Sequence, residues 1–132
     1  MAGLTFDEAA HLLRRMGFGG TPEEIDDLVS RGREGAVDHL INYSQIDNRA
    51  MEDALERSFD FSDPTANENF NQGEIRRWWF TRMILTRRQF EEKMTLFWHN
   101  HFATAASKVP DILMFNQIDR VLRPFALDRF DT

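Results

Sequence analysis

Two histidines flank an asparagine inside an aromatic run, KMTLFWHNHF, which extends from Lys93 to Phe102. Imidazole transfers protons near neutral pH and is a common metal ligand, so this run is the first candidate for chemistry. Successive residues of an α-helix turn by about 100°, which sends His99 and His101 about 200° apart on a regular helix. We therefore expect that the two rings do not share one metal ion. The zinc motif His-Glu-x-x-His works because its histidines lie four residues apart.

Each candidate residue of this run has two interpretations. His101 follows Met94 and Phe97 on an apolar row, which favours a buried or half-buried ring satisfied by a backbone carbonyl or a polar neighbour. The alternative is an acid–base group or a ligand completed by residues elsewhere. Trp98 and Asn100 are candidate binding residues beside it, although Asn100 can also cap the end of the helix.

His99 lies on a different side, above Glu92 and Thr95. An exposed surface position and a position in a site both stay open for it. No Asp/Glu pair has a spacing distinctive of an acid–base couple, because the acidic runs 23–27 and 52–56 are typical of solvated faces.

Arginines and aromatics alternate in EIRRWWFTRMILTRRQFEEK, residues 74–93, a mixture that can stack on single-stranded nucleic acid. Helical spacing favours a core instead, with Ile75, Trp79 and Met83 in one row. We expect at least one Trp in the core and Arg82 across it, which makes Arg82 a further candidate binding residue.

The charges argue against nucleic acid as a partner. Residues 1–72 carry 15 acidic and 6 basic side chains, and residues 73–132 carry 7 and 10, for a net charge of −6. Arg87 with Glu91, and Arg88 with Glu92, lie at i, i+4 and are predicted to form surface ion pairs if one helix continues through them. An acidic chain without a dense basic stripe opposes the approach of phosphate.

The glycines of RRMGFGGTPEE do not indicate a phosphate loop. Phosphate-binding glycine motifs follow a strand, whereas here a helix precedes them, and Glu23 and Glu24 would repel an anion. We expect a turn between helices, in which Gly17, Gly19 and Gly20 serve positive φ angles or close packing.

The elements that position these residues are all predicted to be helices. Thr5 with Glu8 and Thr21 with Glu24 form capping boxes. Apolar periodicity predicts helices from residue 6 to Gly17 and over 22–31, 34–43, 49–58 (capped by Asn48 or Asp47), 74–86, 89–103 and 113–123. Residues 60–73 are predicted to be a loop or mobile insertion.

Composition limits the class of protein and the kinds of site that this chain can form. A chain of 132 residues with 42% hydrophobic residues, twelve Phe and three Trp is sufficient for one packed domain. It has no apolar run of the roughly 18 residues that a membrane span needs and no N-terminal signal segment. The absence of cysteine excludes disulfides and thiolate zinc sites but leaves the compartment open.

We predict an all-α fold of five to seven short helices in an irregular orthogonal array. Residues 1–132 form a single N-terminal part of a larger domain in this interpretation. The last segment, ALDRFDT, starts a further amphipathic stretch with Phe125, Leu127 and Phe130, which predicts a fragment of a larger helical protein.

Two long motifs resemble one bacterial family. AAHLLRRMGFGGTPEEIDDLV, residues 9–29, and EKMTLFWHNHFATAASKV, residues 92–109, are similar to the N-terminal part of the family called domain of unknown function 1800. The pair Trp78–Trp79 lies between them, and MFNQIDRVLRPFALDRF, residues 114–130, is also similar. The resemblance implies a helical protein of several hundred residues, exported in many members, with no established activity or cofactor.

Two functions follow as hypotheses. The first is a helical module of an exported bacterial protein, which binds the remainder of its own polypeptide or a protein partner in assembly. The second is part of an enzyme or metal-dependent protein, in which Trp98, His99 and His101 form one wall of a site completed by residues beyond this chain. Reaction, cofactor, metal and oligomeric state stay unknown at this stage.

Overall fold

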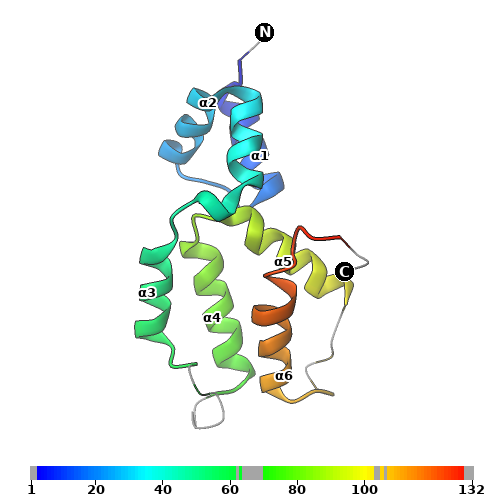
Figure 1. Cartoon of the computed structure of the whole chain (residues 1–132). Coiled ribbons are helices and arrows are strands. Elements are labelled where there is room, and N and C mark those ends of the chain that lie inside the picture. Colours follow the sequence, from blue (N-terminus) through cyan, green and yellow to red (C-terminus); the bar gives the residue numbers. More distant parts are fainter. Residues whose placement is uncertain (1–2, 62, 64–69, 103–104, 106, 130–132) are drawn as a thin grey trace.

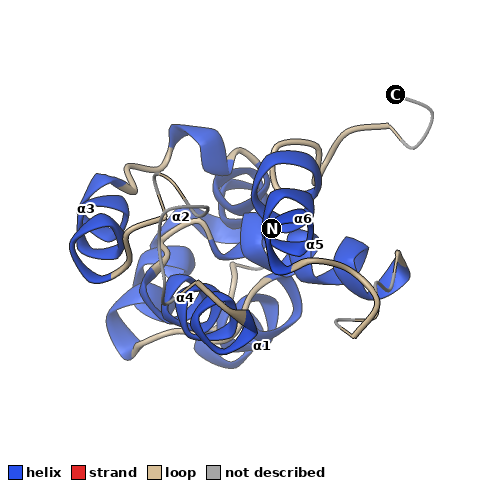
Figure 2. Cartoon of the chain, turned by 90° about the horizontal axis from the view of Figure 1, so that it is seen from below, coloured by secondary structure: helices blue, strands red, loops and turns tan. Residues whose placement is uncertain are grey.

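Helices are the only regular secondary structure in the part of the chain that the structure, a computed structural model, describes: residues 3–61, 63, 70–102, 105 and 107–129 (Figure 2). The elements in order are α1 (Phe6–Met16), α2 (Pro22–Ile41), a 3₁₀ turn η1 (Tyr43–Gln45), α3 (Arg49–Ser58), α4 (Gln72–Leu85), α5 (Gln89–His101), α6 (Asp111–Asn116) and a π-helix η2 (Gln117–Leu122). The all-α prediction is confirmed. Within these residues, no helix has the length and apolar character needed to cross a membrane.

An N-terminal hairpin of α1 and α2 stands at one end of the molecule (Figure 1). Both predicted capping boxes are present, at Thr5 with Glu8 and at Thr21 with Glu24. α2 contains the predicted break, because Gly32 has a φ of 75° and a ψ of 176° that interrupt the helical geometry. The hairpin has its own small core around residues such as Leu13.

The glycine loop after α1 joins this hairpin to α5. Gly17 approaches the side chain of Gln89 so closely that a Cβ on Gly17 would lie 2.2 Å from Oε1 of Gln89. That oxygen accepts a hydrogen bond of 2.9 Å from the backbone N of Phe18, and Nζ of Lys93 donates one of 3.1 Å to the carbonyl of Gly17. Gly19 has a φ of 99°. The predicted roles of close packing and positive φ are therefore confirmed for these two glycines.

The larger core lies below the hairpin, where α3, α4 and α6 lie side by side and α5 runs across them (Figure 1). It is built mainly from large apolar side chains: Met51, Leu55, Phe59, Ile75, Trp78, Trp79, Met114, Phe115 and Ile118. Both tryptophans of the WW pair are buried in it, where the helical spacing predicted at least one. α4 begins at Gln72 with Asn71 as its cap, so the predicted loop 60–73 ends slightly earlier, and half of that segment lies outside the described residues.

The link between α4 and α5 differs from the sequence-based prediction. One helix does not continue through it, because α4 ends at Leu85 and α5 begins at Gln89. Asn48 does not cap α3 with its side chain. Its amide instead donates to Oγ1 of Thr86 at 3.1 Å and accepts from the backbone N of Arg87 at 2.9 Å, so it holds the break in place.

The last predicted helix, 113–123, is two helical segments of different pitch. α6 passes directly into the π-helix η2, in which the backbone N of Arg123 donates to the carbonyl of Ile118, five residues back, at 3.2 Å. Pro124 follows, and it can neither donate to the carbonyl four residues earlier nor tolerate that carbonyl at helical distance. The turn before it widens, which periodicity alone did not predict.

Candidate functional site

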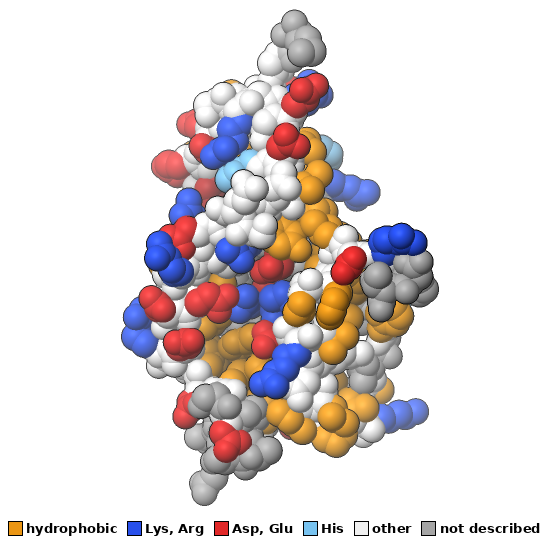
Figure 3. Space-filling view, viewed as in Figure 1, with side chains coloured by type: hydrophobic (Ala, Val, Ile, Leu, Met, Phe, Trp, Pro, Cys, Tyr) orange, Lys and Arg blue, Asp and Glu red, His pale blue; other side chains and the backbone are white. Residues whose placement is uncertain are grey.

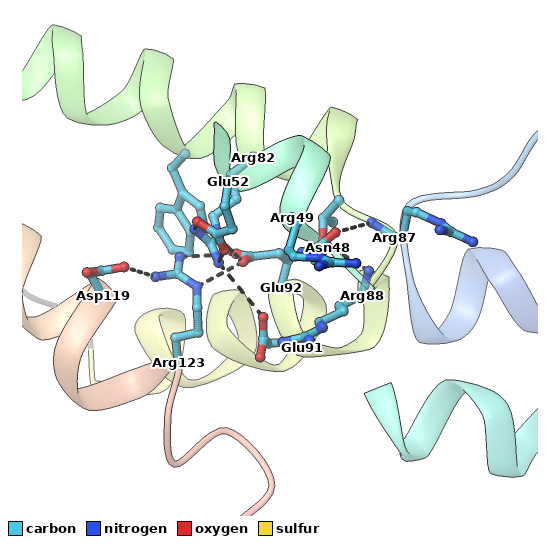
Figure 4. A network of polar contacts seen from close by, with 12 residues as sticks. Asn48, Arg49, Glu52, Arg82, Arg87, Arg88, Glu91, Glu92, Asp119 and Arg123 are labelled. Atoms are coloured by element: carbon cyan, nitrogen blue, oxygen red, sulfur yellow. Dashed lines mark hydrogen bonds and ion pairs between the residues drawn. The ribbon is translucent and has the colours of Figure 1, made fainter. Parts of the chain in front are cut away.

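α5 turns one side towards α4 and η2 and leaves the other side open. On its inner side Glu92 is completely buried and accepts four hydrogen bonds (Figure 4). Arg82 donates from Nε to Oε1, Arg123 donates to both oxygens at 2.8 and 3.2 Å, and Nε1 of Trp79 donates to Oε2 at 3.0 Å. Three elements, α4, α5 and the residue after η2, therefore meet at one carboxylate.

The two guanidinium groups extend this centre into an alternating row of charges. Arg82 also binds Glu52 on α3, with Nη2 2.7 Å from Oε1, and Arg123 also binds Asp119 on η2. Burial raises the pKa of Glu92, but Arg123 and Arg82 outweigh it, so the pKa lies below its ordinary value of 4.5. Glu92 is therefore ionised and fully paired, which is the condition under which a buried charge is tolerated.

Glu91 lies beside this row, where its surroundings disfavour the charged form of its carboxyl group. Burial raises the pKa of its carboxyl first, and the neighbouring charge of Glu92 adds to the effect. Arg82, whose Nη2 is 4.0 Å away, compensates only in part. Glu91 thus holds its negative charge at a cost.

Two predicted ion pairs are wrong because of this arrangement. Glu92 does not pair with Arg88 on the surface; Arg88 instead donates to the carbonyls of Ile46 and Ser44 at 2.7 and 3.2 Å. Arg87 points away from the row (Figure 4). Arg82 does lie across a tryptophan as predicted, with its guanidinium carbon 5.8 Å from the ring centre of Trp78.

His99 belongs to the inner side of α5. Its ring meets Trp79 edge to face at 5.1 Å, and its Nδ1 is buried with no hydrogen-bond partner among the described residues. Burial lowers the pKa of His99 below its ordinary value of 6.5. This ring is therefore neutral at pH 7.

His101 belongs to the open side. The expectation of a buried or half-buried ring is wrong, because His101 is exposed and packs among Phe97, Trp98 and Phe102, with ring centres 4.9–6.4 Å away. The two imidazoles face different neighbours on a helix that stays regular through His101. Asn100 is exposed as well.

An apolar groove of about 280 Å³ lies on this open side, between α5 and η2. It is lined by Trp98, Phe102, Val121, Leu122 and Phe125, and Asp128 and Arg129 lie at its edge. Hydrophobic side chains show on the right of the space-filling view, over α5 and the segment after η2 (Figure 3). Trp98 is thus the predicted binding candidate that the structure places in a groove.

Two contacts from α5 hold the far wall of this groove. Arg123 is drawn inward to Glu92, and Nε1 of Trp98 donates to the carbonyl of Ala126 at 2.8 Å. Val121, just before these anchors, and Phe125, between them, are both more than half exposed. The wall itself contains the π-helix, and π-helical turns are uncommon and occur frequently at functional sites.

A second hollow lies between α3 and α6, with hydrophobic side chains at its floor and acidic ones along its rim (Figure 3). Its volume is about 520 Å³, and Glu52, Glu56, Asp60 and Asp119 line it together with Arg82. Two of these carboxylates, Glu52 and Asp119, are paired with Arg82 and Arg123.

The sequence contained signals for the residues that we did not select. Glu92, Thr95 and His99 lie at i, i+3 and i+7 on one side of α5, and both Glu92 and Thr95 are completely buried. Asp119 and Arg123 have the i, i+4 spacing that surface ion pairs also have. The spacing alone therefore does not show that Arg123 is buried. Within the described chain, no group of three or more His, Asp or Glu side chains is arranged to hold a metal ion.

Comparison with known proteins identifies the family. The family described as "Protein of unknown function (DUF1800)" matches residues 11–132, so the chain belongs to it, as the resemblance implied. No curated protein and no solved structure matches the chain.

Proposed function

We propose that this member of the DUF1800 family is a helical module that binds a protein segment in the groove between α5 and η2. One observation carries the proposal: large apolar side chains are gathered around a groove on the surface instead of in the core. The segment belongs either to the remainder of the same polypeptide or to a separate protein. The exported bacterial setting stays a prediction from the resemblance.

The amount of exposed apolar surface supports this proposal. Phe97, Phe102, Val121, Phe125 and Leu127 are 54, 44, 52, 57 and 44% exposed. Taking roughly 200 Å² for a fully exposed aromatic side chain, the three phenylalanines alone present about 310 Å² of apolar surface. A contiguous patch of several hundred Å² is within the range that is often functional on a single-chain protein.

Site-specific photo-crosslinking tests the proposal. A photoreactive phenylalanine analogue replaces Phe125 at the groove or Phe80 on α4, a matched control that is 61% exposed and does not line the groove. The full-length protein is irradiated in its own cells, and the crosslinked peptides are sequenced by mass spectrometry. We expect one recurrent peptide from position 125 and none from position 80, with loss of the crosslink when Val121→Glu is added.

The result that contradicts the proposal is equally clear. If positions 125 and 80 yield the same scattered products, or if Val121→Glu leaves the crosslink unchanged, the groove is not a binding surface. Circular dichroism of each variant shows whether it is folded.

His99 favours a second candidate function. Its Nδ1 is buried without a partner among the described residues, so a group supplied by other residues can bond to it, as in an acid–base or metal site. Metal content of the full-length protein, wild type against His99→Ala and His101→Ala, tests this. Loss of bound metal without loss of fold supports the second function, whereas variants that only lower the melting temperature of a metal-free protein count against it.

A further inference from the structure

We propose that the cleft between the N-terminal hairpin and the α4–α5 link binds a small zwitterion, an amino acid or a short peptide, through Arg87 on the link and Asp38 on the hairpin. The cleft shares no lining residue with the α5–η2 groove. This proposal therefore goes beyond the function proposed for the groove and does not depend on it.

Two adjoining cavities form the cleft. The larger has a volume of about 580 Å³ and the smaller of about 220 Å³, and His39, Ile46 and Arg87 line both. The hairpin has its own core on one side, and the larger core lies on the other side (Figure 1). A space of this size between two separately packed parts of a protein is a common place for a small-molecule site.

Contacts from the start of α5 hold the two walls of the cleft together. Arg88 donates to the carbonyls of Ile46 and Ser44 at 2.7 and 3.2 Å. Oε1 of Gln89 accepts from the backbone N of Phe18 at 2.9 Å. These bonds fix the hairpin against α5, so the cleft is preformed. A preformed cleft loses less conformational freedom when a ligand enters it.

Arg87 supplies the positive charge of the cleft. Its backbone N donates to Oδ1 of Asn48 at 2.9 Å, which fixes the start of the side chain. The guanidinium points away from the buried row of charges (Figure 4) and has no hydrogen bond or ion pair within the described residues. By contrast, Arg31 in the same cavity is paired with Asp27 at 2.8 Å. The planar fork of Arg87 is therefore available to bind a carboxylate through two hydrogen bonds.

Asp38 and Glu23 supply negative charge from the hairpin. Asp38 lines the larger cavity and Glu23 the smaller, and neither carboxylate has an ion pair or hydrogen bond in the described part of the chain. The remaining carboxylates that line the cleft are engaged by neighbours: Glu24 by Thr21, Asp27 by Arg31 and Asp47 by Arg49. The charges left for a ligand are thus of both signs, which favours a zwitterion over a phosphate or a simple cation.

Neutral polar groups complete the lining of the larger cavity. Burial lowers the pKa of His39 below its ordinary value of 6.5, and Arg31 adds to this effect. The ring is therefore neutral at pH 7, with one donor and one acceptor nitrogen. Asn42 and Gln45 add two amides. These groups offer hydrogen bonds to the polar atoms of a ligand without changing the balance of charge.

Isothermal titration calorimetry of the full-length protein tests the inference. The probes are the common amino acids and their glycyl dipeptides, which distinguish a free amino acid from a short peptide. We expect saturable binding of at least one probe. Its N-acetyl derivative lacks the ammonium group and its amide derivative lacks the carboxylate. Each derivative should bind at least about ten times more weakly, because each loses one charge-assisted contact.

Variants on both walls locate the binding. Arg87→Gln should weaken the affinity at least about tenfold and Asp38→Asn at least about threefold, since a bidentate contact is worth more than a single exposed charge pair. Arg76→Gln on α4 and Asp53→Asn on α3 are matched controls, because both residues are exposed and line neither cavity. These controls should change the affinity less than about twofold. Circular dichroism shows whether each variant is folded, and Arg87→Lys replaces Arg87→Gln if the latter is not.

Three results overturn the inference. The first is the absence of saturable binding for every probe. The second is an N-acetyl or amide derivative that binds as tightly as its parent, which would show that the ligand need not be a zwitterion. The third is undiminished binding to the Arg87 variant or to Asp38→Asn. None of these results alters the crosslink from position 125, so failure of this site is distinguishable from failure of the groove.

Discussion

The two sides of α5 invert the usual distribution of residue types. Its inner side buries the carboxylate of Glu92 between Arg82 and Arg123, and its open side exposes Phe97 and Phe102. Buried charges and exposed large apolar patches are the informative exceptions in a folded protein. On the inner side both carboxylate oxygens of Glu92 are hydrogen-bonded. Glu92, Arg82 and Arg123 therefore connect α4, α5 and the segment after η2, and we call these three residues the structural joint. On the open side large apolar side chains line a groove, and our proposal places recognition there.

The comparison also explains how the open side of α5 depends on the inner side. Arg123 is bound to Glu92, and Leu122, directly before it, and Phe125, two residues after it, line the groove. A contact inside the protein therefore positions a wall on its surface.

Removing the joint should produce the largest effect. Glu92→Ala leaves two guanidinium groups buried without their shared partner, and breaking such a pair costs about 3–5 kcal/mol. Urea unfolding followed by circular dichroism measures the loss. Glu56→Ala, an exposed carboxylate on α3, is the control and should change the free energy of unfolding by less than about 0.5 kcal/mol. Equal effects of the two variants would show that the buried row is not a structural joint.

The hydrogen bond that anchors the groove wall should have a moderate effect. Trp98→Phe removes the donor to the carbonyl of Ala126, and losing one such bond costs about 1 kcal/mol. Because the wall is then held at one point fewer, the crosslink from position 125 should also weaken. Phe80→Leu, at an exposed position on α4 outside the groove, is the control. A Trp98→Phe protein with unchanged stability and an unchanged crosslink would contradict the anchoring role.

Glu91 should give a smaller, pH-dependent effect. Its pKa is raised by burial and by Glu92, so the folded state binds more protons than the unfolded state above pH 4.5, and stability falls as pH rises through the folded pKa. Glu91→Gln should therefore be more stable than the wild type at pH 7. The difference should disappear below pH 4.5. Urea unfolding at both pH values provides the test, and a variant less stable at pH 7 would reverse the assigned sign.

The smallest effect concerns His99. Burial lowers its pKa, so between the folded pKa and 6.5 the unfolded state binds more protons, and this residue makes the protein less stable as pH falls through that window. A nuclear magnetic resonance titration should give His99 a lower midpoint in the native chain than in the chain unfolded by urea. A native midpoint at or above the unfolded one would show that Nδ1 has found a charged or hydrogen-bonding partner.

Local signals in the sequence predicted most of the helices. The capping boxes at Thr5 and Thr21 and the break between 22–31 and 34–43 act within one or two turns, so composition and spacing were sufficient. The burial of Glu92 was missed because its partners lie 10 and 31 residues away, and its local spacing to Arg88 imitates a surface pair. The π-helix was missed because a periodicity of 3.6 assumes a constant pitch. The groove arises only when α5 and η2 come together.

The indole N–H signals of Trp98 and Trp79 provide the most direct test of the two-sided description of α5. Trp98 donates to Ala126 at the groove, whereas Trp79 donates to Glu92 in the buried joint. On titration with the peptide that crosslinks to position 125, in a ¹H–¹⁵N correlation spectrum, the signal of Trp98 should shift progressively and that of Trp79 should stay in place. A shift of Trp79 with an unchanged Trp98 would contradict the assignment of recognition to the open side.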